Sequence, residues 1–309
     1  MTDQLHRLVD VATGQHGAIA PHQAELVGVT QRELRRRVQS GVLQKSGIHV
    51  VRSPFIEATP LADLAALVLD CGPGAVAAGR TAAALHELDG FDLAAPFHVT
   101  IPRGRSIERR GHHIHTTSEL PGVDRTRIQG IPSIAAERCL IDLARVLRPD
   151  QLTAALDCAL RDQLTTEPRL HGRIAALRRS GRHGIPALLA VIEGSEVTRG
   201  AHSWLERRFL ELCADRGLPR PNPQVVLAST PNRLVRVDFW FPGKPVVVEV
   251  LGYRYHRTPS QLARDAERLN ALVMSGKQPL QFTYDHVTLE PDWVAGQVAD
   301  ALEPFTSAG

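Results

Sequence analysis

Cysteine is scarce in this 309-residue chain. Its four cysteines are far apart, and no two of them form a CxxC pair; they are Cys71, Cys139, Cys158 and Cys213. Structural zinc sites and small disulfide-stapled domains both need closely spaced cysteines. The sequence therefore argues against both classes, and it is compatible with a reducing compartment, so we expect a cytoplasmic protein.

Long apolar runs are also missing. No stretch approaches the roughly 18 residues that cross a bilayer. The N-terminus has acidic and polar residues where a secretory signal has a basic and then an apolar segment. The phosphate-binding motif GxxxxGK[ST] and the nucleophile motif GxSxG do not occur. We therefore expect no membrane association and no nucleotide cofactor.

Lysine is the third shortage, since only three of the 36 basic residues are lysine and 33 are arginine. Arginine matches phosphates and base edges better than lysine does. A GC-rich genome produces the same bias, however, and the formal net charge is only +3. Composition alone therefore does not identify a nucleic-acid-binding protein. The length and the 43% apolar content predict a globular chain of about two domains.

The first 55 residues combine short helical patterns with a small hairpin. Apolar spacing predicts three helices, the third over 31–39, where Thr30 and Glu33 form a capping-box pattern. An alternating segment over 42–51 then predicts a hairpin. This order predicts a winged helix-turn-helix over 1–55, in which the third helix enters the major groove of DNA.

Basic side chains give the candidate DNA contacts of this region. The third helix has four arginines beside its inward-facing apolar residues, and the hairpin adds a lysine. A basic loop between two predicted strands, further along the chain, adds two more arginines. The candidate DNA-binding residues are Arg32, Arg35, Arg36, Arg37, Lys45, Arg103 and Arg105.

Residues 56–195 predict a mostly helical middle domain. Four segments have helical periodicity, and short strands over 97–101 and 113–116 flank the basic loop. The stretch from Cys71 to Val76 resembles a phosphate loop, but the helical pattern before it makes it a helix stop. Glycines around Gly181 to Gly184 and at Gly194 predict a linker to the next domain.

The histidines His112, His113 and His115 invite interpretation as a metal site. A strand places only the last two on one face, and no third ligand is apparent in the sequence. We therefore interpret these histidines as structural.

From residue 199 the pattern changes to alternating helices and strands. In a hairpin centred between Gly243 and Lys244, Asp238 lies directly opposite Glu249, and like charges at such positions destabilise a sheet. Two carboxylates on a largely apolar sheet must share a proton or hold a cation. Oxygen ligands suit Mg²⁺ or Mn²⁺. The alternative is that both acids lie on a solvated edge.

Further candidates stand before and after these strands. Glu206 is a third acid, although its place in a capping-box pattern also suits it to cap the Ser203 amide. His256 follows the second acidic strand and suits a general base or a phosphate ligand, although a lone histidine is often structural. Asp265 and Arg268 lie one turn apart on a predicted helix, and such pairs are usually weak surface contacts.

Five ordered pieces of the segment 199–304 match one family: SWLERRFLELCADRGLPRPNPQ, RVDFWFP, VVVEVLGYRYH, RDAERLNALV and QFTYDHV. The segment resembles the very-short-patch-repair-like endonuclease domains of the PD-(D/E)XK superfamily. The resemblance implies a metal held by Asp238 and Glu249, with Glu206 assisting. His256, Asp265 and Arg268 match positions that recur in this group, and the implied catalytic set is Glu206, Asp238, Glu249 and His256.

The chain departs from this family at two positions. Leu251 stands where the superfamily has lysine, and this subgroup aspartate, and leucine neither ligates metal nor polarises water. Gln281 stands where arginine is common. These departures place catalytic competence in question.

The first 195 residues resemble a second family. The matching pieces are QHGAIAPHQAELVGVTQRELRRRVQSGVLQKSGIHVV, PLADLAALVLDCGPGAVAAGRTAAALHELDG, FHVTIPRGR and GIPSIAAERCLIDLAR. They are similar to the AbiEi-type antitoxins of bacterial type IV toxin–antitoxin systems. The resemblance implies operator binding by Arg32, Arg35, Arg36 and the wing, and a cognate toxin as a partner.

The sequence thus predicts an α+β or α/β multidomain protein with domains over 1–55, 56–195 and 199–304. One hypothesis is a DNA-binding protein with a metal-dependent DNA endonuclease domain that uses Mg²⁺ or Mn²⁺. The alternative is a non-catalytic transcriptional regulator or antitoxin, without a cofactor, in which a degenerate nuclease fold binds DNA, a toxin or another protein. A small-molecule enzyme is a third class of function, but the sequence contains no cofactor motif that supports it.

Overall fold

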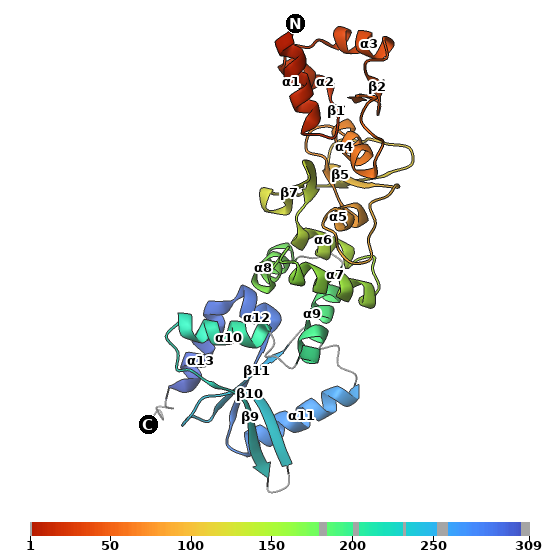
Figure 1. Ribbon diagram of the computed structural model, residues 1–309. Helices are drawn as coiled ribbons and strands as arrows, with labels where there is room; N and C mark the ends of the chain where they lie inside the picture. Colours follow the sequence, from red (N-terminus) through yellow and green to blue (C-terminus); the bar gives the residue numbers. More distant parts are fainter. Residues whose placement is uncertain (1, 179–183, 200–203, 231–232, 252–258, 304–309) are drawn as a thin grey trace. The chain divides into compact units, whose positions relative to one another are not determined.

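The computed structural model describes residues 2–178, 184–199, 204–230, 233–251 and 259–303 (Figure 1). The chain divides into two compact units, Met1–Arg173 and Ile174–Gly309. Helices and strands occur in both units, and the strands form three sheets. The expectation of a mixed α and β chain with more than one compact unit is confirmed.

The first unit begins with three helices and three very short strands. They are α1 (Thr2–Thr13), β1 (Ala18–Ile19), α2 (Pro21–Leu26), α3 (Gln31–Gln39), β2 (Gln44–Lys45) and β3 (Val51–Arg52). The strands form an antiparallel sheet in the order β1-β3-β2. Buried Leu8, Leu34 and Val51 bring α1, α3 and the sheet into one small core. The predicted third helix has the predicted bounds.

A larger sheet with surrounding helices follows in the same unit. Its elements are α4 (Pro60–Asp70), β4 (Val76–Ala77), α5 (Gly79–Leu85), β5 (His98–Pro102), β6 (His113–Thr117), the 3₁₀ turn η1 (Gly122–Asp124), β7 (Arg125–Ile128), β8 (Ile131–Ile134), α6 (Ala136–Leu143) and α7 (Pro149–Arg161). The next helix, α8 (Glu167–Leu177), begins in this unit and ends in the second. The strands form a five-stranded mixed sheet in the order β6-β5-β4-β8-β7. The predicted helix stop is also present, because α4 ends at Asp70 and Gly72 has a φ of +83°.

The prediction of a mostly helical middle domain is therefore incomplete. The missed strands β4, β7 and β8 have only two to four residues. β8 also leads within two residues into α6, so its isoleucines and those of the helix form one apolar pattern. Short strands of this kind give too few alternations for the sequence pattern to separate them from a helix.

The second unit contains a four-stranded sheet and five further helices among its described residues. The elements are α9 (Ile185–Arg199), α10 (Trp204–Asp215), β9 (Asn222–Thr230), β10 (Arg233–Trp240), β11 (Val246–Leu251), α11 (Pro259–Met274), β12 (Gln278–Thr283), α12 (Tyr284–Leu289) and α13 (Pro291–Leu302). The sheet order is β12-β11-β10-β9, with β12 parallel to β11 and the other neighbours antiparallel. Phe209 of α10 packs on Phe239 of β10, with ring centroids 4.8 Å apart.

The hairpin that joins β10 and β11 has the predicted register. Phe239 pairs with Val248 and Trp240 with Val247, and Gly243 in the turn has a φ of +75°. The helix α12 was not predicted. Of the predicted linker, residues 181–183 lie outside the described part, and Gly194 lies within α9. No helix of the described residues is long and apolar enough to cross a membrane.

Candidate nucleic-acid interface and acidic site

The acidic site lies where β10 and β11 run side by side. Continuing the register of this hairpin by one residue places Asp238 opposite Glu249. The Val250 N–H donates a hydrogen bond of 3.0 Å to the Asp238 carboxylate. The pKa of Asp238 is raised to about 6, mainly by burial and also by the charges of Glu206 and Glu249, and the Val250 N–H and Arg268 oppose this rise. Negative charge is therefore concentrated around Asp238.

Glu249 is only 4% exposed and has two protein partners. Arg268 of α11 forms an ion pair with one carboxylate oxygen, and the Gln281 amide donates a 3.0 Å hydrogen bond to the other. Gln281 reaches it because β12 pairs Gln281 with Glu249 in parallel register. The expectation that Arg268 makes only a weak surface contact is wrong, since its partner is a buried acid from another element.

Glu206 comes to this region from the first turn of α10. Its carboxylate accepts a 2.7 Å hydrogen bond from the Gln224 amide, and the Arg236 guanidinium donates at 2.6 Å to the other end of that amide. The predicted capping of Ser203 concerns a residue outside the described part of the chain. The charge of Glu206 acts on Asp238, so the structure brings the three predicted acids together.

The three acids do not form a ready-made metal site in this conformation. Protein groups donate hydrogen bonds to each carboxylate, and Glu249 has a donor on both oxygens. Within the described ranges, no three His, Cys, Asp or Glu side chains are arranged as a ligand set for one metal ion. The predicted ligands therefore do not fit Mg²⁺ or Mn²⁺ without rearrangement.

Two further residues of the second unit, Leu251 and Lys244, lie within the described part of the chain. Leu251 is half-buried at the end of β11, where it pairs with Thr283. The Lys244 ammonium donates to the Leu302 carbonyl at 2.8 Å, which fixes it at the end of α13. His256 lies outside the described residues.

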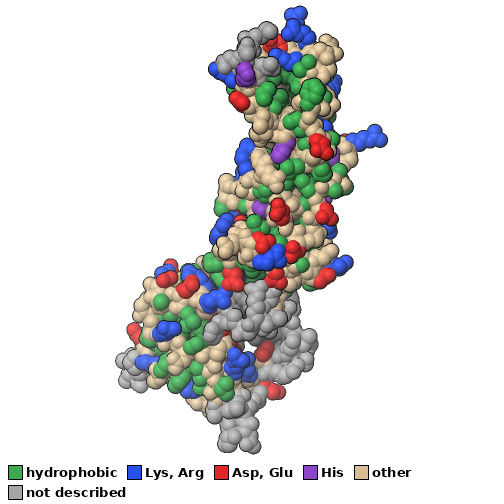
Figure 2. All heavy atoms as spheres, in the orientation of Figure 1, with side chains coloured by type: hydrophobic (Ala, Val, Ile, Leu, Met, Phe, Trp, Pro, Cys, Tyr) green, Lys and Arg blue, Asp and Glu red, His purple; other side chains and the backbone are tan. Residues whose placement is uncertain are grey.

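The candidate DNA-binding arginines lie on the outer side of α3. Arg32, Arg35 and Arg36 are exposed, Arg37 is half-buried, and Leu34 faces the core. The capping box fixes the start of the helix: the Glu33 N–H donates to the Thr30 hydroxyl at 3.3 Å, and the Thr30 N–H donates to the Glu33 carboxylate at 2.8 Å. Blue Lys and Arg side chains project from the N-terminal end of the molecule in Figure 2.

A groove runs between α3 and the small sheet. It has a volume of about 440 Å³, and its lining includes Gln31, Arg35, Gln39 and Lys45. Lys45 of β2 is exposed, as the prediction of a wing contact requires. Basic and amide side chains thus border one continuous surface of α3 and the hairpin.

The two arginines of the loop after β5 that the sequence predicts to contact DNA lie in different surroundings. The Arg105 guanidinium donates to the carbonyls of Cys71 and Pro73 at 2.8 and 2.9 Å, beyond the C-terminal end of α4. Arg109 forms an ion pair with Asp70. Of the two loop arginines predicted to contact DNA, Arg103 is exposed and Arg105 is half-buried. The structure therefore gives Arg105 a stabilising role and leaves Arg103 accessible.

Asp70 also holds the hairpin of the first small sheet. Its carboxylate accepts a 2.6 Å hydrogen bond from the His49 N–H, and its side chain is buried. Gly47 passes so close that an added Cβ would lie 2.6 Å from the Asp70 carboxyl carbon. One buried acid at the end of α4 therefore fixes the loop between β2 and β3, a contact that no local sequence pattern indicates.

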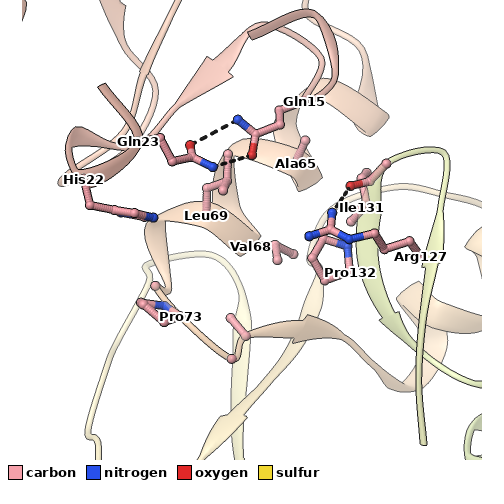
Figure 3. Close-up of a pocket in the computed structure, with 14 residues that line it drawn as sticks. Gln15, His22, Gln23, Ala65, Val68, Leu69, Pro73, Arg127, Ile131 and Pro132 are labelled. Carbon is pink, nitrogen blue, oxygen red and sulfur yellow. Dashed lines mark hydrogen bonds between the residues drawn. The ribbon is translucent and has the colours of Figure 1, made fainter. Parts of the chain in front are cut away.

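A small pocket of about 200 Å³ lies between α2, α4 and β8 (Figure 3). Gln15 and Gln23 donate their amides to each other on one side, at 3.1 and 2.7 Å. Arg127 lines the pocket and donates to the Gly130 carbonyl at 2.8 Å. Because these polar groups already satisfy one another, the pocket adds no candidate to the sequence-based set.

All four cysteines are buried and free. Burial raises the pKa of the Cys71 thiol to about 11 and that of Cys213 to about 12. Thiols with such pKa values are poor nucleophiles at neutral pH.

No protein-family model and no curated protein matches the chain. Among solved structures, the RV2827C protein from Mycobacterium tuberculosis aligns with a TM-score of 0.40 and 16% sequence identity. The alignment covers 64% of this chain and 82% of that one. A likeness this weak supports no inference about the site.

Proposed function

We propose that the chain is a DNA-binding protein whose first 55 residues form a winged helix-turn-helix. The order of α1, β1, α2, α3, β2 and β3 supports this proposal, because winged helix-turn-helix domains have helices and a terminal hairpin in the same order. The observation that carries the proposal is the capped helix α3, which turns Leu34 inward and Arg32, Arg35 and Arg36 outward. A recognition helix needs such a face, because phosphates position it and base edges give it specificity.

For the second unit, we propose a nuclease-like domain of the PD-(D/E)XK type that acts as a binding platform. The chain's own residues compensate the buried acid: Arg268 and Gln281 occupy both oxygens of Glu249. A metal ion would have to displace a buried ion pair before it reached this carboxylate. Leu251 then provides no group to polarise water. On this basis the chain is a transcriptional regulator or an antitoxin of the AbiEi type, with DNA and a cognate toxin or other protein as partners.

One observation favours the second candidate, a metal-dependent DNA endonuclease. The pKa of Asp238 is raised to about 6 by burial and by the charges of two neighbouring acids. A divalent cation would relieve this repulsion, provided that Arg268 moved away from Glu249. In that case Asp238 and Glu249 would hold Mg²⁺ or Mn²⁺, and Glu206 would assist.

Labelled DNA distinguishes the two candidates. The wild type and Asp238→Ala are incubated with duplex and nicked DNA in Mg²⁺ or Mn²⁺, and binding and cleavage are measured on the same samples. The platform proposal predicts binding by both proteins and cleavage by neither. Robust wild-type cleavage that Asp238→Ala abolishes would establish the endonuclease instead. Absence of any DNA binding would overturn the proposal as a whole.

A further inference from the structure

Three histidines of the first unit lie together on one face of the five-stranded sheet. His98 is on β5, and His113 and His115 are on β6, which is an edge strand parallel to it. The register pairs His98 with His113, and His115 follows two positions later on the same face. Sequence reasoning missed this group, because the third member lies on a strand 15 residues upstream of His113.

Two nitrogens of this group have about the spacing of two ligands of one metal ion. His98 Nδ1 and His115 Nε2 are 3.1 Å apart. Two imidazole nitrogens bound tetrahedrally to Zn²⁺, each about 2.0–2.1 Å from the metal, lie roughly 3.3 Å apart. The rings of His98 and His115 are stacked, with centroids 5.4 Å apart. A small shift of either ring therefore admits a metal between the two nitrogens.

The third ring lies beside this pair. The His113 centroid is 4.5 Å from that of His98 and 6.5 Å from that of His115. In the conformation described, the three side chains do not yet converge on one point. His113 is exposed, so its side chain can rotate toward the pair without displacing core residues.

We propose that His98, His113 and His115 form a binding site for a divalent transition metal, with Zn²⁺ as the best match. Imidazole ligands suit Zn²⁺, Ni²⁺ and Cu²⁺ rather than Mg²⁺. Three histidines leave one position of a tetrahedral ion open to water. A bound ion joins the edge strand β6 to β5, beside the loop that contains Arg103 and Arg105. Zinc thereby stabilises the base of that loop.

The test is a zinc titration of the purified, metal-stripped full-length chain. We expect one Zn²⁺ per chain by calorimetry and a rise in the melting temperature, since a ligand of the folded state stabilises it. His115→Gln and His113→Gln change exposed positions and leave the core intact. Because loss of a group that only supports a metal ligand costs 10–100-fold in affinity, loss of His115 itself should cost about 100-fold or more.

Two controls separate this site from other binding. His22→Ala removes another exposed histidine of the same unit and should leave zinc affinity unchanged. Cobalt substitution should give the visible absorption of a protein-bound ion with nitrogen ligands, and His115→Gln should remove that absorption. Zinc binding with the same affinity and stoichiometry in His115→Gln and the wild type would overturn the proposal. Failure of the wild type to bind zinc above the level of a weak surface contact would do so as well.

Discussion

The fold buries the Asp238 carboxyl group near two other acids, which disfavours its charged form. Its pKa is about 6 in the folded chain, against 3.8 for an ordinary aspartate. The folded state therefore binds this proton more tightly than the unfolded state does. It follows that the free energy of unfolding falls as the pH rises from about 4 to about 6, and that the loss persists at neutral pH.

Asp238→Asn should remove this loss. Asparagine retains an oxygen that accepts the Val250 N–H, but it has no charge to desolvate or to repel the neighbouring acids. We expect the free energy of unfolding at pH 7.5 to rise by about 1–2 kcal/mol, and the decline between pH 4 and 6 to flatten. Urea unfolding at several pH values, with a chelator present, measures both effects.

Glu249→Gln is the matched control, because it also neutralises one acid of the same hairpin. Here the lost charge is the partner of Arg268, whose side chain is two-thirds buried. We expect this variant to lose about 2 kcal/mol of stability, less than the roughly 3–5 kcal/mol for a fully buried ion pair, because the Arg268 side chain is partly exposed to solvent. Stabilisation by both substitutions would show that Arg268 does not compensate Glu249.

Among the elements, α3 has a capping box that stabilises the fold and arginines that we propose to contact DNA. Three hydrogen bonds join Thr30 and Glu33 in its capping box. Thr30→Ala should cost about 1 kcal/mol of stability. Thr30→Ser retains the hydroxyl acceptor and should restore most of it. Chemical denaturation measures the difference, and equal stability of the alanine and serine variants would contradict the capping role.

The DNA contacts of α3 are tested by the double variant Arg35→Ala and Arg36→Ala. Both side chains are exposed, so we expect little change in stability. If each neutralises one phosphate, the slope of log affinity against log salt should become less steep by about 0.9 per arginine. Fluorescence anisotropy at several salt concentrations measures the slope.

Arg148→Ala controls for net charge, since this arginine is 73% exposed at the start of α7. It should leave both affinity and slope unchanged. If the α3 double variant also leaves both unchanged, Arg103 and the loop after β5 become the better candidates for DNA contact.

The elements also show which features the sequence can predict. The capping box, the alternation of β10 and β11 and the turn at Gly243 are local signals, and they gave α3 and the hairpin register correctly. The five-stranded sheet depends instead on pairing between segments far apart, such as β4 with β8. No local sequence pattern determines which of these distant strands pair with each other.

The same limit applies to the buried ion pairs. Arg138 and Arg173 both donate to the fully buried Asp124, from 14 and 49 positions away. Arg268 of α11 pairs with Glu249 of β11, although its position one turn from Asp265 suggested a weak surface contact. Partner choice in such pairs depends on the tertiary fold. The sequence therefore predicted which acids approach one another, but not which base compensates them.

At the scale of the whole molecule, the chain contains two compact units with separate interiors. The first unit includes the five-stranded sheet, around which Leu64, Val99 and Ile101 are fully buried. The second has its own core of Val237, Phe239 and Val247 around the four-stranded sheet. Each interior is large enough to unfold cooperatively by itself.

We therefore expect two thermal transitions in the full-length chain, each sensitive to substitutions in one unit. Thr30→Ala should lower only the transition of the first unit, and Asp238→Asn at pH 7.5 should raise only that of the second. For units of this size, each kcal/mol moves a transition by about 2–4 °C. The double variant should show both shifts at their individual sizes, because distant sites act additively. Differential scanning calorimetry measures the result, and a single transition moved by either substitution would show that the two units unfold as one.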